Sequence, residues 1–289
     1  MVLESLTTPE KAEKSPWEML LLGMLYGGVA VILSLWIFRE QSSIVLVLLT
    51  VIACLPLMHN SLKREEEKDD LIANESFLLK EHSKALSFYV FLFIGFVIAY
   101  SAAYIFLPSG LVVELFKAQT DTINKINANV AVDGHMELKL VESGNLFFKI
   151  LNNNLRVFLF AIFFSFFYGA GSIFILTWNA SVISAAMGNF FRTHLSDYAT
   201  ALGFAQLGHY MSIYGASILR YFVHGLPEIL GYFIGALAGG IISVAVIRHD
   251  IGSPQFVHIL KDSVDLIILG ILILVVAGLL EVYVTPMIF

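Results

Sequence analysis

Cysteine and charge are both scarce in this sequence. A single cysteine, Cys54, occurs among 289 residues, which excludes an internal disulfide and a metal site built from cysteines. Charged residues make up 14% of the chain. Soluble domains contain about 25%, so an ordinary soluble enzyme is excluded. Acidic residues outnumber basic ones by 23 to 17, and the formal net charge of −6 argues against nucleic-acid binding.

Apolar residues are abundant instead. Hydrophobic residue types make up 58% of the chain, and its mean hydropathy is +0.81. A membrane-spanning helix needs about 20 mostly apolar residues. Suitable runs occur at Met19–Phe38, Gln41–Leu62, Phe88–Leu107, Val157–Phe191, Tyr198–Leu219, Ile229–Ile247 and Leu266–Leu280. The sequence therefore predicts an all-α, polytopic membrane helix bundle with about seven spans.

Two of these spans are expected to be interrupted. The uncharged run 157–191 covers 35 positions, which is too long for one simple span, and Asn179 interrupts it. Gly225 and Pro227 predict a second break, because proline favours the first turn of a helix. We therefore expect a broken or re-entrant segment around residues 179–225, of a kind that also lines transporter binding sites. The sequence leaves open whether 180–219 forms one full span or a re-entrant pair.

The distribution of lysine and arginine predicts the orientation of the chain. Loop 60–85 is short and carries the mixed run Lys63-Arg64-Glu65-Glu66-Glu67-Lys68-Asp69-Asp70. Basic residues concentrate in cytoplasmic loops, so we expect a cytoplasmic N-terminus and a C-terminus outside the cell membrane. The mixed charges of loop 60–85 indicate either a solvated helical connector or a docking site for a soluble partner.

The longest loop, 108–150, is expected on the outer side. Apolar residues at near-helical spacing predict an amphipathic helix over 111–127. Asp133-Gly134 lies between two short apolar stretches, and this dipeptide suits the tight turn of a β-hairpin. A folded outer cap is the expectation.

Ionisable residues at membrane depth form the main candidate site. Arg220, His224 and Glu228 follow one another at intervals of four around the expected break. Such groups are costly in an apolar phase, so they mark either a function or a paired structural role. Two interpretations stay open, a polar cap on a buried helix start and a centre for an ion, proton or partner. Glu281 near the end of the last span is expected at the membrane interface.

Two further motifs have structural interpretations. Asn153, Asn154 and Arg156 open the fourth helix, where amides can cap exposed N–H groups. A stripe of small residues recurs every fourth position in the sixth helix, at Gly231, Gly235 and Gly239. Small residues let helices approach closely in a membrane, but the sequence leaves open whether the contact is within one chain or between two.

No motif of a catalytic, cofactor-binding or metal site is present in the sequence. It lacks a glycine-rich phosphate loop, a zinc signature and a Gly-x-Ser-x-Gly elbow. We therefore expect no catalytic residue, no cofactor and no metal. His224 and Glu228 alone are too few ligands to predict a zinc site.

Several motifs together resemble those of one family. They are Asn153-Asn154-x-Arg156, Trp178-Asn179, His224-Gly225-x-Pro227-Glu228 and the closing Leu280-Glu281-Val282-Tyr283-Val284-Thr285-Pro286. In this order they resemble the stage II sporulation protein M family of integral membrane proteins. The resemblance implies a membrane domain over 86–289, preceded by an added two-helix module over 1–85. It also implies an anchor for partner proteins, because family members in spore-forming bacteria bring peptidoglycan-degrading proteins to the engulfing septum.

These observations lead to two functional hypotheses. The first is a non-enzymatic membrane scaffold, embedded in membrane lipid, that forms a homo-oligomer and organises soluble or envelope protein partners without binding nucleic acid. The alternative is a channel or transporter for a small solute, ion or lipid, based on the broken segment, the polar cluster and the glycine stripe. An intramembrane hydrolase is weakly supported, because no nucleophile is paired with a recognisable base or metal.

Overall fold

The computed structural model of the chain describes residues 7–72, 74–124, 140–165, 170–197, 204–249 and 251–288. Every regular element in these ranges is helical, which confirms the predicted all-α class. The α-helices are α1 (Pro9–Lys14), α2 (Glu18–Ile37), α3 (Ser42–Leu71), α4 (Glu75–Phe106), α5 (Ser109–Leu115), α7 (Leu140–Ser165), α8 (Ala170–Asp197), α9 (Phe204–Arg248), α10 (Pro254–Leu279) and α11 (Thr285–Ile288). A 3-10 turn, Arg39–Gln41, precedes α3, and a π-helical turn, Leu280–Val284, joins α10 to α11.

Seven of the described helical segments are long and apolar enough to cross a membrane. They are Glu18–Ile37, Arg39–Leu71, Ser76–Phe106, Gly144–Ser165, Ile173–Thr193, Phe222–Arg248 and Pro254–Ile288. Their number agrees with the prediction, but the boundaries in the second half of the chain do not. The run 157–191 is divided between α7 and α8, and 198–219 is not a separate candidate span among the described residues.

Both predicted helix breaks are wrong. Helix α8 continues through Asn179. The side-chain amide of Asn179 donates to the Ile175 carbonyl at 2.9 Å, so its hydrogen-bonding need is met within the helix. Helix α9 also continues through Gly225 and Pro227. Proline is tolerated inside membrane helices where neighbouring helices support the backbone, and packing here overrides the local preference for a helix start. Helices α8 and α9 are therefore unbroken at Asn179, Gly225 and Pro227.

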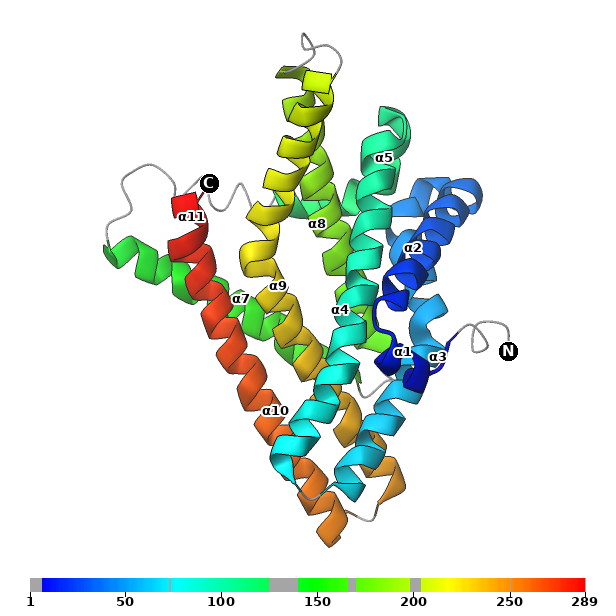
Figure 1. Cartoon of the computed structure of the whole chain (residues 1–289), viewed down its shortest axis with the longest axis vertical. Coiled ribbons are helices and arrows are strands. Elements are labelled where there is room, and N and C mark those ends of the chain that lie inside the picture. Colours follow the sequence, from blue (N-terminus) through cyan, green and yellow to red (C-terminus); the bar gives the residue numbers. More distant parts are fainter. Residues whose placement is uncertain are drawn as a thin grey trace.

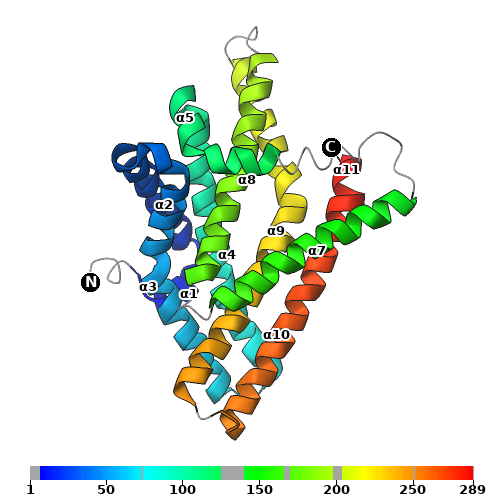
Figure 2. The same ribbon diagram turned by 180° about the vertical axis from the view of Figure 1, so that it is seen from behind.

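The helices converge toward one end of the bundle. The α3–α4 and α9–α10 connections lie together at the bottom of Figure 1, and we call this region the lower end. Helix α5, the start of α9 and helix α11 lie toward the opposite, upper end. Helix α7 crosses the bundle obliquely, which Figure 2 shows from behind. Helix α4 runs without interruption through residues 85 and 86, where the module boundary was predicted.

The predicted helix in loop 108–150 is present in two pieces. Helix α5 ends at Leu115, and a second helical stretch covers 117–124. Val112, Leu115 and Phe116 are buried against the bundle. The predicted hairpin around Asp133-Gly134 lies outside the described residues.

The glycine stripe of α9 packs against α7 and α10 of the same chain. A Cβ atom added at Gly235 would lie 2.7 Å from Cδ2 of Phe158 in α7, and one at Gly239 would lie 2.9 Å from the Cα of Ile162. A Cβ at Gly231 would lie 2.9 Å from Cγ of Leu274 in α10. The stripe thus brings three helices together within one chain and offers no argument for a homo-oligomer.

Candidate functional site

Two buried polar clusters stand out in this apolar bundle. The first lies where α7, α9 and the π-helical turn meet. Asn154 of α7 donates from Nδ2 to Oε1 of Glu228 at 2.6 Å, and its Oδ1 accepts a hydrogen bond from the Tyr232 hydroxyl at 3.0 Å. Glu281 of the π-helical turn lies beside Glu228. We call Asn154, Glu228, Tyr232 and Glu281 the carboxyl cluster.

Glu228 and Glu281 are neighbouring acidic side chains of the carboxyl cluster. A carboxylate can only accept hydrogen bonds, so two carboxyl groups can bond to each other only when one of them carries a proton. Asn154 supplies a donor to the same pair and Tyr232 fixes the Asn154 amide. π-helical turns are rare and occur frequently at functional sites, and here one carries Glu281. The carboxyl cluster therefore gathers two acidic side chains, an amide and a hydroxyl between α7, α9 and the π-helical turn.

The structure brings together some of the predicted site residues and separates others. His224 lies one turn before Glu228 on α9, and its Nδ1 lies 3.2 Å from the Thr285 hydroxyl. Glu281, which we group with Arg220, His224 and Glu228 as polar residues of the apolar segments, lies beside Glu228 in the carboxyl cluster. The side chain of Arg220 is not among the described ones.

Asn153 and Arg156 are exposed on α7, away from Asn154. Asn153 lines a separate cavity of about 610 Å³ between α7 and α8, and Trp178 and Asn179 line the same cavity. The residues of the helix-start motif therefore lie in different surroundings, and only Asn154 belongs to the carboxyl cluster. Tyr232 was missed by sequence reasoning, although its position four residues after Glu228 places it on the same helix face.

The second cluster occupies the lower end and is charged. Lys68 of α3 donates from Nζ to Oε1 of Glu65 at 2.6 Å and to Oε1 of Glu13 of α1 at 3.1 Å. His82 of α4 places Nδ1 2.7 Å from Oε2 of Glu65 and Nε2 2.8 Å from Oδ1 of Asp69. These ion pairs join α1, α3 and α4.

A fourth helix, α9, is joined through Glu66, whose side chain is fully buried. Arg248 at the end of α9 donates to Glu66 Oε2, and His249 places Nε2 2.7 Å from Glu66 Oε1. We call Glu13, Glu65, Glu66, Lys68, Asp69, His82, Arg248 and His249 the lower-end network.

The lower-end network corrects one expectation and supplies a missed site. The prediction of a helical extension over loop 60–85 is right, since α3 and α4 extend to residues 71 and 75. However, Glu65, Glu66 and Asp69 are buried rather than solvated. A sequence signal existed in Arg248-His249, two basic residues directly after an apolar span, which need an acidic partner if they are held near the bundle.

Metal binding has no support in the described part of the chain. No three histidine, cysteine, aspartate or glutamate side chains converge there in a way that could hold a metal ion.

The chain is similar to a known protein family. The family model for stage II sporulation protein M matches residues 85–286, from within α4 to beyond the closing π-helical turn, and this range includes the whole carboxyl cluster. No curated protein and no solved structure matches the chain. Because the match covers more than half of the chain, the protein belongs to the stage II sporulation protein M family of membrane proteins.

Proposed function

We propose that the protein is a non-enzymatic scaffold that holds soluble partner proteins at the cell membrane. The observation that carries this proposal is the tip of the α3–α4 hairpin. Leu71 is 82% exposed and Phe77 is 51% exposed, although both lie beyond the most apolar part of their helices and next to the charged run 63–70. Exposed apolar side chains in a polar surround are typical of protein-binding sites.

The hairpin is also held rigidly, which favours docking. Lys68, His82 and Arg248 fix its inner face to the bundle through the lower-end network. Lys63 and Asp70 stay exposed on its outer side. A preordered surface loses little conformational entropy when a partner binds, and charges around an apolar centre select the partner. We infer that the partner is a soluble protein with an apolar pocket for Leu71 and Phe77.

The scaffold proposal predicts a selective loss of partner binding. Replacing Leu71 and Phe77 together with serine should leave the fold intact and reduce recovery of the co-purifying soluble protein more than tenfold, because it removes the apolar anchors. The measurement is quantitative mass spectrometry of complexes isolated in mild detergent. Phe106→Ser is the control, because Phe106 is 83% exposed at the other end of α4. Equal partner recovery with the double variant and the wild type would contradict the proposal.

The orientation that we infer places the lower end in the cytoplasm and the C-terminus outside. Loop 60–85 carries the densest basic residues, which supports this orientation. An impermeant maleimide should label Glu40→Cys on intact cells and label Asp70→Cys only after permeabilisation, because both positions are exposed and lie at opposite ends. Cys54 is buried and can remain. The reverse labelling pattern would show that the orientation is inverted.

The carboxyl cluster supports a second candidate function, transport of protons or small ions. Glu228 and Glu281 are neighbouring acidic side chains within candidate membrane spans, and two such groups can share one proton. If the cluster conducts, Glu228→Gln should stay folded, since the amide keeps the shape and hydrogen bonds of the carboxyl, and proton flux in reconstituted vesicles should be lost. If the cluster is structural, the wild type should show no flux.

Thermal stability and flux are therefore measured on the same Glu228→Gln protein. Glu228→Leu is the companion variant. It leaves the Asn154 amide without its acceptor and should be the less stable of the two. A wild-type protein without flux of protons, ions or lipids would remove the transport candidate. A stable Glu228→Gln protein that has lost a clear wild-type flux would mean that scaffolding is not its only function.

A further inference from the structure

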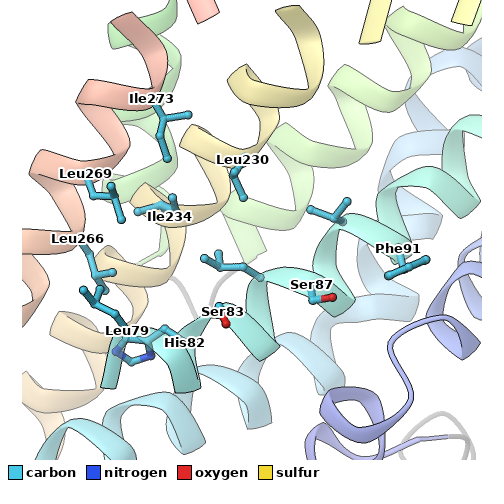
Figure 3. A pocket seen from close by; sticks show the side chains of 12 residues that line it. Leu79, His82, Ser83, Ser87, Phe91, Leu230, Ile234, Leu266, Leu269 and Ile273 are labelled. Carbon is cyan, nitrogen blue, oxygen red and sulfur yellow. The ribbon is translucent and has the colours of Figure 1, made fainter. Parts of the chain in front are cut away.

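A groove opens between α4, α9 and α10 near the lower end. Its volume is about 440 Å³, and Figure 3 shows the side chains around it. Val90, Phe91, Leu230 and Ile273 form its apolar part. Its polar residues are few and come from the early turns of α4. The groove is therefore apolar along most of its length and polar at one end only.

The polar end of the groove is the end nearest the α3–α4 connection. His82, Ser83 and Ser87 line it there, and α4 then leads away from the lower end toward Val90 and Phe91. His82 belongs to the lower-end network, so the groove touches that network at one residue. This order of polar and apolar residues matches that of an amphiphile whose head lies at the membrane surface.

The apolar part of the groove lies within candidate membrane spans. Leu230 belongs to the span Phe222–Arg248, and Leu269 belongs to the span Pro254–Ile288. Leu269 is 37% exposed, so the groove opens sideways to its surroundings at this level. At this depth the surroundings are hydrocarbon, and an acyl chain is the occupant whose chemistry fits apolar walls.

Charged residues beside the polar end match a phospholipid headgroup. Helical spacing places Lys80 and Lys84 on the edge of α4 that also carries Ser87, because these positions differ by three, four and seven residues. Both lysines are exposed. On the facing helix α10, Asp265 is exposed one turn before Leu269. These three charged residues flank the groove rather than line it, and Lys84 is paired with Glu81 at 2.5 Å. The remaining lysine charge on one margin suits a phosphate, and the carboxylate on the other margin suits an ammonium group.

We propose that this groove binds one phospholipid, with an acyl chain along Phe91, Leu230 and Ile273 and the phosphate beside Lys80 and Ser87. The site is separate from the exposed tip at Leu71 and Phe77, so it goes beyond the scaffold function and can fail without it. A chain in the groove covers the edge of the His82 ring and keeps water from its ion pairs with Glu65 and Asp69.

Native mass spectrometry with added phosphatidylethanolamine tests the site. After exchange into mild detergent, the wild type should retain one phospholipid. A double variant, Val90→Trp with Leu269→Trp, fills the groove and should reduce bound lipid at least tenfold. Leu272→Trp is the matched control, because Leu272 is 57% exposed on α10 and does not line the groove. Thermal unfolding of all three proteins shows whether they are folded.

A separate experiment tests the position of the phosphate. Lys80→Glu should weaken retention of phosphatidylethanolamine several-fold and leave retention of diacylglycerol, which lacks the phosphate, unchanged. Equal weakening of both lipids would overturn the placement of the phosphate. Equal lipid retention by the wild type and the folded groove-filling variant would overturn the site itself, and so would a wild type that retains no lipid. A protein bound in the groove instead of lipid would also overturn it.

Discussion

Replacing Gly95 with leucine should separate α2 from α4 and leave most of the protein aggregated after extraction. A Cβ atom at Gly95 would meet the Leu20 carbonyl oxygen and would lie 2.9 Å from both the Cα of Gly23 and the amide nitrogen of Met24. All three neighbours are backbone atoms of α2, so no side-chain rotation can relieve the clash. Overpacking costs typically 1–3 kcal/mol, and a clash with a helix backbone should reach at least about 3 kcal/mol.

The consequences of this change extend beyond the local contact. Helices in a membrane gain little from the hydrophobic effect and depend on close packing, so lost contact is not replaced by another driving force. The measurement is the fraction of monodisperse protein by size-exclusion chromatography, together with the melting temperature in detergent. Gly28→Leu is the control, because a Cβ at Gly28 meets nothing within 4 Å. Similar behaviour of the two variants would mean that α2 and α4 are not held by this contact.

The fold class and the span count were predictable because they depend on hydropathy, which is a local property. Helix ends were less predictable. Pro227 and Asn179 favour a break locally, yet both lie inside continuous helices. For Asn179 the compensating bond to the Ile175 carbonyl is only visible once the helix exists. Contacts that form only in the folded helices thus decided where the helices end.

The candidate site was predictable only in part, since its pairs are distant in sequence. His224 and Glu228 stood out as polar residues in an apolar region, but the partner of Glu228 is Asn154, 74 positions away. The lower-end network was missed for a similar reason. Glu66 sits in a charged run that looks solvated, and its partner Arg248 is 182 positions away. The local sequence pattern can therefore identify an unusual residue, but it cannot identify the distant residue that contacts it.

The lower-end network ties the predicted N-terminal module to the family domain. Glu66 lies before the family match at 85–286, and Arg248 lies within it. Helix α2, which also precedes the match, packs on α4 through Gly23 and Gly95. The module is therefore built onto the family domain through both an ionic and a close-packed contact, which explains how a docking tip at its end can be rigid relative to the membrane domain.

Removing Arg248 should be the most damaging change to this connection. Arg248→Met would leave the Glu66 carboxylate buried with His249 as its remaining partner. Breaking a buried ion pair by removing one partner costs about 3–5 kcal/mol, because a buried charge is left uncompensated. Arg248 is itself 39% exposed, so we expect the free energy of unfolding to fall by about 3 kcal/mol, at the lower limit of this range. The free energy of unfolding in detergent is the quantity to measure.

Two further variants isolate the cause of this loss. Adding Glu66→Leu to Arg248→Met should recover much of the stability, since replacing a buried pair by apolar side chains of similar size is often neutral. Arg39→Met removes the exposed pair with Glu114 at the opposite end, whose side chains are 62% and 37% exposed, and should cost much less stability than Arg248→Met because solvent screens the pair. If the double variant is no more stable than Arg248→Met alone, the loss does not arise from the uncompensated charge on Glu66. If Arg39→Met costs as much as Arg248→Met, burial does not distinguish the two pairs, and the lower-end network is not what fixes α3 to α9.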